Sequence, residues 1–264
     1  MKFQPDNAPT NKYSPEQKER IRFLLEMADK NLSSPNTIGY HGAGLATLKL
    51  LIQGGKFPGK AYEEGTAFKK GDLHFFPLVK GFPNEFSKAY LVSLMDLSSN
   101  DLNIESLNEE YGTNEATKYA KSGSQRQIFM EVAKLDITNK EHCNLMDELL
   151  PISYKTEEAV GHISKIYNDP VAYEQISTIA KKLNLDKQKL IDIIMKVAER
   201  MQTQAGFVFA LDKKILKEYE IKGGDQGSDL YINCPDGLDY KLISGLRPIG
   251  QKEKEFLVSL RAGI

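Results

Sequence analysis

Residues 38–60 read IGYHGAGLATLKLLIQGGKFPGK, and the order of residue types in this stretch decides the fold. A short extended segment, residues 37–41, ends on His41 and is followed by small residues and an apolar segment with helical spacing. The pair Gly54-Gly55 predicts the end of that helix, because glycine adopts the left-handed conformation of a helix C-terminus. A strand that ends in a histidine, followed by glycines and a helix, places an imidazole and bare backbone at a sheet edge, which is a usual place for a ligand. The alternative is a packed or capping histidine with no ligand.

Two more local signals flank this stretch. Upstream, Ser14-Pro15-Glu16-Gln17 predicts a helix start, with an N-cap serine, proline at the first helical position and Gln17 at the capping-box position. This helix should run to about Asn31. Downstream, GDLHFFP at residues 71–77 predicts a second strand that proline closes. Asn84 then caps a further helix that should run to about Leu97.

The middle and the end of the chain differ in period. From about 101 to 203 the apolar spacing is helical, most clearly at 125–135, 157–167, 171–183 and 187–202. After Ala205 the pattern favours strands. The expected elements are a strand at 206–211, a short helix at 212–219, a turn at 223–227 and strands at 229–234 and 240–249. The sequence therefore predicts an α+β protein with β-rich pieces near both ends.

Composition limits the function classes. The 264 residues include 35 basic and 36 acidic side chains, a net charge of −1, so we do not expect nucleic acid or an anionic membrane as the main partner. The start of the chain lacks a signal-peptide h-region, and no apolar run reaches the roughly 20 residues that cross a bilayer. Two cysteines, Cys143 and Cys234, without CxxC spacing, predict neither a disulfide framework nor a metal site. We expect a soluble protein that is cytoplasmic when made.

Three other motifs carry little weight. Gly42 and Gly44 nearly match the dinucleotide fingerprint, but Thr47 occupies the third glycine position and no second strand ending in an acid follows, so we reject it. The glycine-rich residues 223–228 lack the Lys and Ser/Thr of a phosphate-binding loop. His142-Cys143 offers a base beside a thiol, but adjacent side chains seldom face each other productively.

The longer pattern, residues 38–60 followed by 71–77, resembles the histidine-containing ADP-ribosyltransferase fold of the poly-ADP-ribose polymerases and diphtheria-type toxins. That family has a strand ending in His-Gly-Thr or His-Gly-Ser, a helix ending at glycine, and then a tyrosine-bearing strand. His41-Gly42 matches the first motif, although Ala43 replaces the hydroxyl residue. His74 stands in the tyrosine position. The segments at 205–250 resemble the closing strands of such a domain.

The resemblance implies a split β-sheet core that binds NAD as a substrate in a cleft between two small sheets, without a metal. It implies that His41 binds the adenosine-side ribose, that the backbone at Gly42 holds the nicotinamide amide and that His74 packs on the nicotinamide ring. Phe75, or its neighbour Phe76, is the stacking residue if the register differs by one or two positions. Simple core packing is the other interpretation of both phenylalanines.

The family also places a catalytic glutamate on its closing strands, where it stabilises an oxocarbenium-like transition state. No glutamate occupies that place. Asp239 is the nearest acid, so we expect it to serve as the catalytic acid together with His74. Asp236 is a second acid in this segment, and another register puts Lys241 there. The structural alternative for Asp239 is that it closes the turn that begins at Pro235.

The expected organisation is a flexible lead-in at 1–13, a first half of the core at 14–100, a large helical insertion at 101–203 and a second half of the core at 204–264. The expected function is mono-ADP-ribosyl transfer from NAD to a protein acceptor, with the helical insertion as the candidate partner-binding region. The alternatives are a catalytically silent NAD-fold binding module, an NAD glycohydrolase and an RNA 2′-phosphotransferase, although arginines are few for the last. Glu253 and Glu255, which we expect on a solvated helix face, precede an apolar C-terminal end. This arrangement resembles the secretion signals of bacterial type IV effectors, and it predicts secretion into a host cell without a cleaved signal peptide.

Overall fold

The computed structural model describes residues 13–30, 32, 34, 36–59, 71–77, 109–136, 139–142, 144–145, 170–223 and 230–264. The helices in these ranges are α1 (Pro15–Asp29), α2 (Leu45–Gly54), α4 (Glu109–Ala133), α7 (Pro170–Lys182), α8 (Lys187–Met201), α9 (Ile215–Glu218), α10 (Gln251–Ala262) and the 3-10 helix η2 (Tyr240–Leu242). The strands are β1 (Thr37–Ala43), β2 (Lys56–Phe57), β3 (Asp72–Pro77), β4 (Phe207–Asp212), β5 (Ile221–Gly223), β6 (Leu230–Asn233), β7 (Leu238–Asp239) and β8 (Ile243–Pro248).

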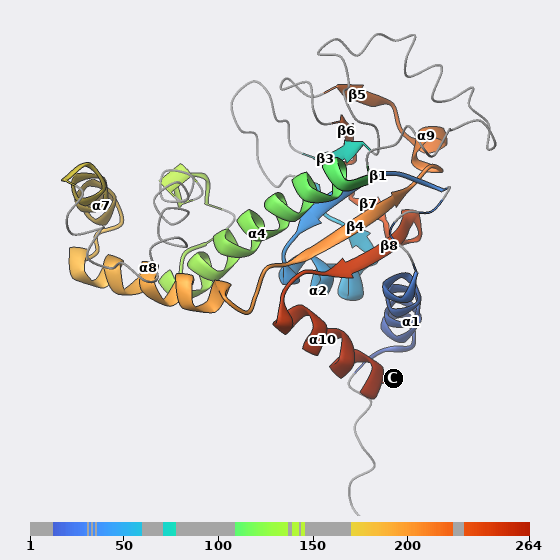
Figure 1. Ribbon diagram of the computed structural model, residues 1–264, viewed down its shortest axis with the longest axis horizontal. Coiled ribbons are helices and arrows are strands. Elements are labelled where there is room, and N and C mark those ends of the chain that lie inside the picture. Colours follow the sequence, from blue (N-terminus) through green and yellow to red (C-terminus); the bar gives the residue numbers. More distant parts are fainter. Residues whose placement is uncertain are drawn as a thin grey trace, which may run out of the picture.

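Strands from distant parts of the chain form a six-stranded antiparallel sheet in the order β5-β6-β3-β1-β4-β8 (Figure 1). The strand β1 lies inside the sheet, between β3 and β4. The short strands β2 and β7 pair with each other in a separate ladder. The predicted α+β class, with strands near both chain ends brought together, is confirmed at this level.

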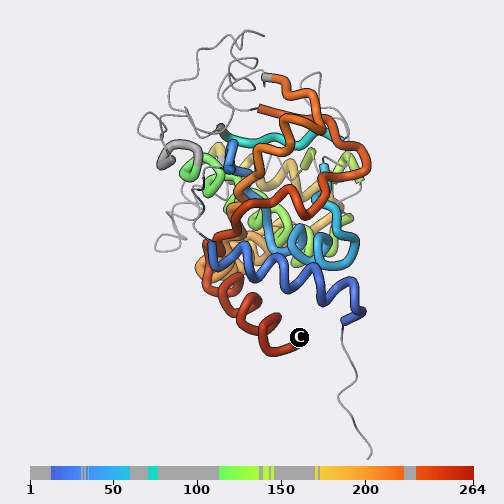
Figure 2. The backbone as a smooth tube through the Cα atoms, turned by 90° about the vertical axis from the view of Figure 1, so that its right-hand side faces the viewer, coloured from blue at the N-terminus to red at the C-terminus, as the bar shows by residue number. Residues whose placement is uncertain are grey.

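Helices cover both faces of the sheet. The helix α4 crosses one face, and α1 and α2 pack against the other, with α10 beside α1 (Figure 1 and Figure 2). Side chains of β4 alternate between the two cores: Phe207, Phe209 and Leu211 face α1 and α2, whereas Val208 and Ala210 face α4. Because both faces are covered, every residue of β4 is buried. This explains why residues 207–211 are a continuous apolar run, which ends at Asp212.

Local signals at α1 and α2 act as the sequence predicts. The amide of Gln17 donates to the hydroxyl of Ser14 at 3.2 Å, and the amide of Ser14 donates to the side chain of Gln17 at 2.9 Å, which completes the capping box. The helix α2 ends at Gly54, and Gly55 adopts a left-handed φ of 70°. The guanidinium of Arg20 donates to the last carbonyls of α2, those of Ile52 at 3.1 Å and Gln53 at 2.6 Å. This side chain therefore joins α1 to α2.

The C-terminal part of α4 packs with α7 and α8 around a second apolar core that includes Phe129, Ile176 and Ile194. The helical nature of 109–133, 170–182 and 187–201 is thus confirmed. The expected helices at 84–97 and 157–167, the lead-in before residue 13, the turn at 224–227 and Cys143 lie outside the described residues. The N-terminal part of α4, by contrast, packs on β1, β3 and β4, so the first described helix of the 101–203 stretch covers the sheet itself.

Several expectations need correction. Residues 240–242 form η2 instead of the start of a strand. Glu253 is fully buried, not part of a solvated face, because its carboxylate accepts the amide of Ala205 at 3.2 Å. Glu255 is exposed as expected.

We predict that Arg20→Ala lowers the free energy of unfolding by about 2 kcal/mol, since two charge-assisted hydrogen bonds at a helix end are lost. Urea unfolding monitored by circular dichroism measures the change. The matched control is Arg22→Ala, an exposed arginine on the same helix, which should change stability by less than about 0.5 kcal/mol. Equal effects of the two substitutions would contradict the role of Arg20.

Candidate functional site

The candidate site lies where β1 and β3 stop pairing. The strand β1 pairs with β4 along its length, from Thr37 to Ala43, but its registered pairing with β3 covers only Gly39 and Tyr40. Continuing this register would set Gly42 opposite His74. At this point the Nδ1 atom of His41 hydrogen-bonds to the carbonyl oxygen of His74 at 2.5 Å. The side chain of His41 thus marks the end of the β1–β3 ladder.

The protonation of His41 follows from these contacts. Burial lowers the pKa of His41 from 6.5 to about 4, more than the hydrogen bond to the His74 carbonyl raises it, and the neighbouring His74 ring lowers it further. The imidazole is therefore neutral near pH 7. A carbonyl oxygen only accepts, so Nδ1 carries the proton and Nε2 keeps a lone pair. The Nε2 atom can then accept a hydrogen bond from a hydroxyl group.

Aromatic contacts place the His41 ring on the face of the sheet that α1 and α2 cover. Its ring meets Phe57 edge to face at 4.9 Å between centroids, and Phe57 meets Phe209 in the same way at 4.8 Å. Phe57 and Phe209 both belong to the core on that side. Edge-to-face rings at such separations attract each other, so they hold the imidazole in one orientation.

His74 projects to the opposite face. Its ring stacks on Tyr231 of β6, with centroids 5.1 Å apart and an interplanar angle of 21°. Phe76 lies two residues after His74 in β3, and its ring contacts Tyr119 of α4. Because residues two apart in a strand share a face, His74 lies on the α4 side as well. The rings of His41 and His74 are therefore not brought together on one face. They are joined through the backbone carbonyl of residue 74.

The phenylalanines expected as alternative stacking residues are core. Phe75 has none of its surface exposed and Phe76 only 4%. Phe75 belongs to the core beneath α1 and α2, and Phe76 to the core beneath α4. Packing on a ligand would require either ring to leave its core.

Gly42 lies on the α4 face. A Cβ at this position would overlap the carbonyl oxygen of Ala116 and lie 2.5 Å from the amide nitrogen of Ala120. The backbones of β1 and α4 are thus in direct contact here, and only glycine permits so close an approach. Of the residues assigned to NAD, Gly42 and His74 share the α4 face, whereas His41 is on the other side.

Asp239 caps η2. Its carboxylate accepts the amide of Lys241 at 3.0 Å and lies 3.4 Å from the Nζ atom of Lys56. In the β2–β7 ladder, Lys56 pairs with Asp239, and Phe57 pairs with Leu238. Because side chains alternate, Asp239 projects away from the side on which Phe57 meets His41. Lys241 and Asp236 are exposed in the same connection.

Sequence reasoning missed three neighbours of the site: Phe57, Tyr231 and the helix α4. Tyr231 falls in a predicted strand, so the period of two places it on one face, but only the pairing of β3 with β6 sets it opposite His74. Phe57 sits in a two-residue strand, too short to give a pattern. The contact of α4 involves alanines, which leave little hydrophobic signal.

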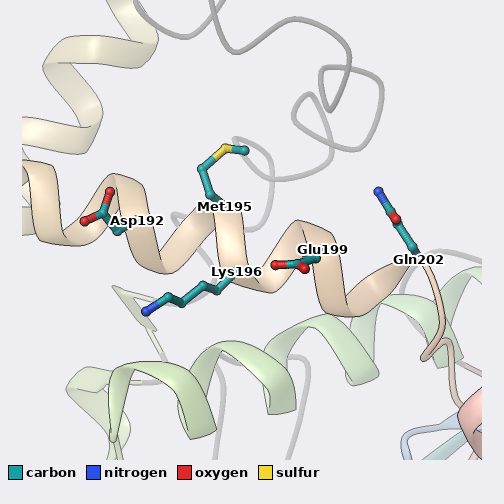
Figure 3. A pocket seen from close by; sticks show the side chains of 5 residues that line it. All are labelled: Asp192, Met195, Lys196, Glu199 and Gln202. Atoms are coloured by element: carbon teal, nitrogen blue, oxygen red, sulfur yellow. The ribbon is translucent and has the colours of Figure 1, made fainter.

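Two open pockets lie away from this site. One, of about 430 Å³, runs along α8, and its described lining is Asp192, Met195, Lys196, Glu199 and Gln202 (Figure 3). The other, of about 510 Å³, lies between α2 and the C-terminal part of α4. Among the residues that the structure describes, no three His, Cys, Asp or Glu side chains gather in a way that could hold a metal ion. No helix in the same ranges is long and apolar enough to cross a bilayer.

Comparison with known proteins gives no relative: no family model matches the chain, and neither the curated proteins nor the solved structures contain a match.

The half-buried His41 predicts a dependence of stability on pH. Because the folded pKa of about 4 lies below the unfolded value of 6.5, the unfolded chain binds the proton more tightly. The stability that neutral His41 contributes is therefore complete above pH 6.5 and is lost as the pH falls toward 4, by at most about 3 kcal/mol.

Urea unfolding of the wild type and His41→Gln at pH 4.5 and 6.5 measures this loss of stability. The variant should show a smaller loss between these pH values, whereas the control His142→Gln should behave as the wild type. Equal losses in all three proteins would contradict a neutral His41 whose pKa is lowered in the folded state.

Proposed function

We propose that this protein is a mono-ADP-ribosyltransferase that transfers ADP-ribose from NAD to a protein acceptor. The resemblance of residues 38–60 and 71–77 to the histidine-containing family suggests the activity. The observation that carries the proposal is the hydrogen bond that holds the His41 ring to the carbonyl of His74 at the end of the β1–β3 ladder.

Recognition of ribose follows from the tautomer of His41. Nδ1 donates its proton to the carbonyl oxygen of His74. The lone pair on Nε2 can therefore accept a hydrogen bond from a ribose hydroxyl. A neutral imidazole suits this role better than a charged one, because imidazolium has no acceptor. The fixed ring orientation, set by Phe57, reduces the entropy lost when ribose binds.

Recognition of nicotinamide would use the other face. Gly42 and His74, to which the resemblance assigns the nicotinamide, lie on the same side of the sheet. The backbone at Gly42 follows the last registered β1–β3 pair, where its polar groups can serve a ligand amide. The His74 ring, already flat against Tyr231, offers a π-face.

In the proposed reaction the bond between ribose C1′ and the nicotinamide nitrogen breaks, and its electron pair leaves with nicotinamide. A nucleophile on the acceptor forms the new bond to C1′ and loses its proton to solvent. Positioning of the two reactants and stabilisation of the developing cation supply most of the rate. The resemblance assigns the second task to Asp239.

A second candidate is a catalytically silent module that binds NAD without turning it over. The contacts of Asp239 favour it, because this carboxylate already caps η2 and pairs with Lys56, on the side away from Phe57. Both candidates predict NAD binding, and they differ in turnover.

NAD should bind with a Kd between micromolar and millimolar, as expected for a ligand held by a few polar contacts and one stack. His41→Ala should weaken binding about tenfold, the effect of losing one hydrogen bond to a neutral acceptor, while circular dichroism remains unchanged. Titration calorimetry measures both affinities, with His142→Ala as the control. No heat at millimolar NAD with the wild type would exclude both candidates.

Asp239→Asn separates the two. If Asp239 stabilises the transition state, turnover per folded molecule should fall by at least about a hundredfold with NAD affinity nearly unchanged. The rate of nicotinamide release in the presence of a cell lysate measures turnover. A wild-type protein that binds NAD but releases no nicotinamide would support the silent module instead. Equal release by the wild type and the variant would remove Asp239 from the mechanism.

A further inference from the structure

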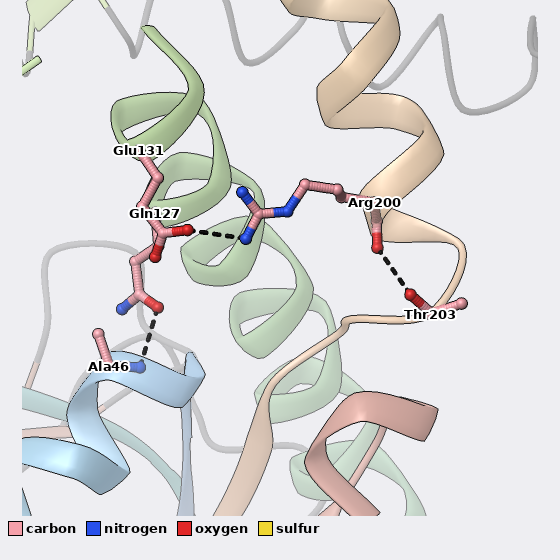
Figure 4. Close-up of polar contacts among 5 residues, drawn as sticks. All are labelled: Ala46, Gln127, Glu131, Arg200 and Thr203. Atoms are coloured by element: carbon pink, nitrogen blue, oxygen red, sulfur yellow. Dashed lines mark hydrogen bonds and ion pairs between the residues drawn. The ribbon is translucent and has the colours of Figure 1, made fainter. Parts of the chain in front are cut away.

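The two halves of α4 are held very differently. The C-terminal half buries Ile128, Phe129 and Met130 in the second apolar core. It is also tied by polar contacts: Glu131 pairs with Arg200 at 2.7 Å, and the side chain of Gln127 accepts the amide of Ala46 at 3.2 Å (Figure 4). Large apolar contacts and an ion pair anchor this half.

The half that crosses the sheet lies against β1, β3 and β4, but the side chains that it buries there are small. Within residues 113–122 the only buried side chains are those of Ala116 and Ala120, which contribute little apolar surface. Tyr119, the aromatic residue within 113–122, is 52% exposed. The hydroxyl oxygen of Thr113 in this half is buried and has no hydrogen-bond partner among the described residues. A buried hydroxyl without a partner opposes the closed arrangement.

Gly123 separates the two halves. A Cβ at this position would meet nothing closer than the amide nitrogen of Gly44, at 3.8 Å, which is an ordinary contact. Packing therefore does not require glycine here, unlike at Gly42. A glycine inside a helix favours the unfolded backbone relative to alanine, so Gly123 weakens α4 where its strongly held half ends.

We propose that residues 113–122 form a hinged cover that opens about Gly123, and that ligand reaches the Gly42 face only in the open state. The second claim, that opening of the cover controls ligand access, is the regulatory part of the proposal. It rests on the proposed function, which assigns the nicotinamide to Gly42 and His74. In the closed state Ala116 and Ala120 occupy the space directly above Gly42. Opening exposes the side chains of Tyr40, Phe76 and Val208 to water. Exposure of apolar surface is unfavourable, so the open state is the minor one.

Hydrogen exchange on the full chain tests the hinge without NAD. Amides of 113–122 should exchange faster than those of 126–133. Gly123→Ala should slow exchange in 113–122 about fivefold, which corresponds to about 1 kcal/mol of helix propensity. Thr113→Val, which removes the unpartnered hydroxyl but keeps the shape, should act in the same direction. The control is Gly54→Ala at the end of α2, where a Cβ meets nothing within 4 Å, and it should leave 113–122 unchanged. Equal protection of both halves of α4, or no effect of Gly123→Ala, would overturn the hinge.

Calorimetry with NAD on the same proteins tests the regulatory part. Because only the open state binds, a fivefold smaller open population in Gly123→Ala should raise the apparent Kd about fivefold. Slowed exchange with unchanged affinity would overturn the regulatory role and leave the hinge standing. Absence of NAD binding in every variant would overturn the proposed function together with this role, while the exchange data would still decide the hinge.

Discussion

The backbone of α4 rests directly on the backbone of β1 at Gly42, and the arrangement on this side of the sheet depends on that contact. Helices usually stand off a sheet by the length of their side chains, whereas here alanines and a glycine reduce the separation to backbone contact. The helix then continues past the sheet into the second apolar core. The same helix therefore connects the sheet at Gly42 to the core that it shares with α7 and α8 (Figure 1).

A second glycine, Gly39, determines how closely β1 approaches its neighbour β3. At Gly39 a Cβ would lie 2.5 Å from the carbonyl oxygen of Phe76, so glycine lets β3 approach closely just before the two strands stop pairing. The imidazole of His41 then takes a carbonyl of β3. The strand thus approaches β3 closely at Gly39 and stops pairing with it within three residues, next to the half-buried His41 ring.

Features that arise from local chemistry could be predicted from the sequence. The capping box at Ser14, the left-handed end of α2 at Gly55 and the strand at 72–77 each depend on a few adjacent residues. Features that depend on distant partners could not. The start of α4 has no hydrophobic period, because the residues it buries on the sheet are small, and the burial of Glu253 depends on the amide of Ala205. For the site, a strand that carries His41 was predictable, but its expected end at His41 at a sheet edge was wrong, because β1 runs on to Ala43 and lies inside the sheet. The opposite faces of His41 and His74 follow from pairing that no single segment encodes.

The strand order also has a consequence for how the chain is made. The centre of the sheet forms when Tyr40 pairs with Ala210, so β1 has to wait until most of the chain has been synthesised before it gains this neighbour. During that interval its apolar edge has no permanent partner, and such edges associate with other chains. Production of the protein should therefore respond to ribosome-associated chaperones and to the speed of translation through the helical middle, more than the stability of the finished fold would suggest.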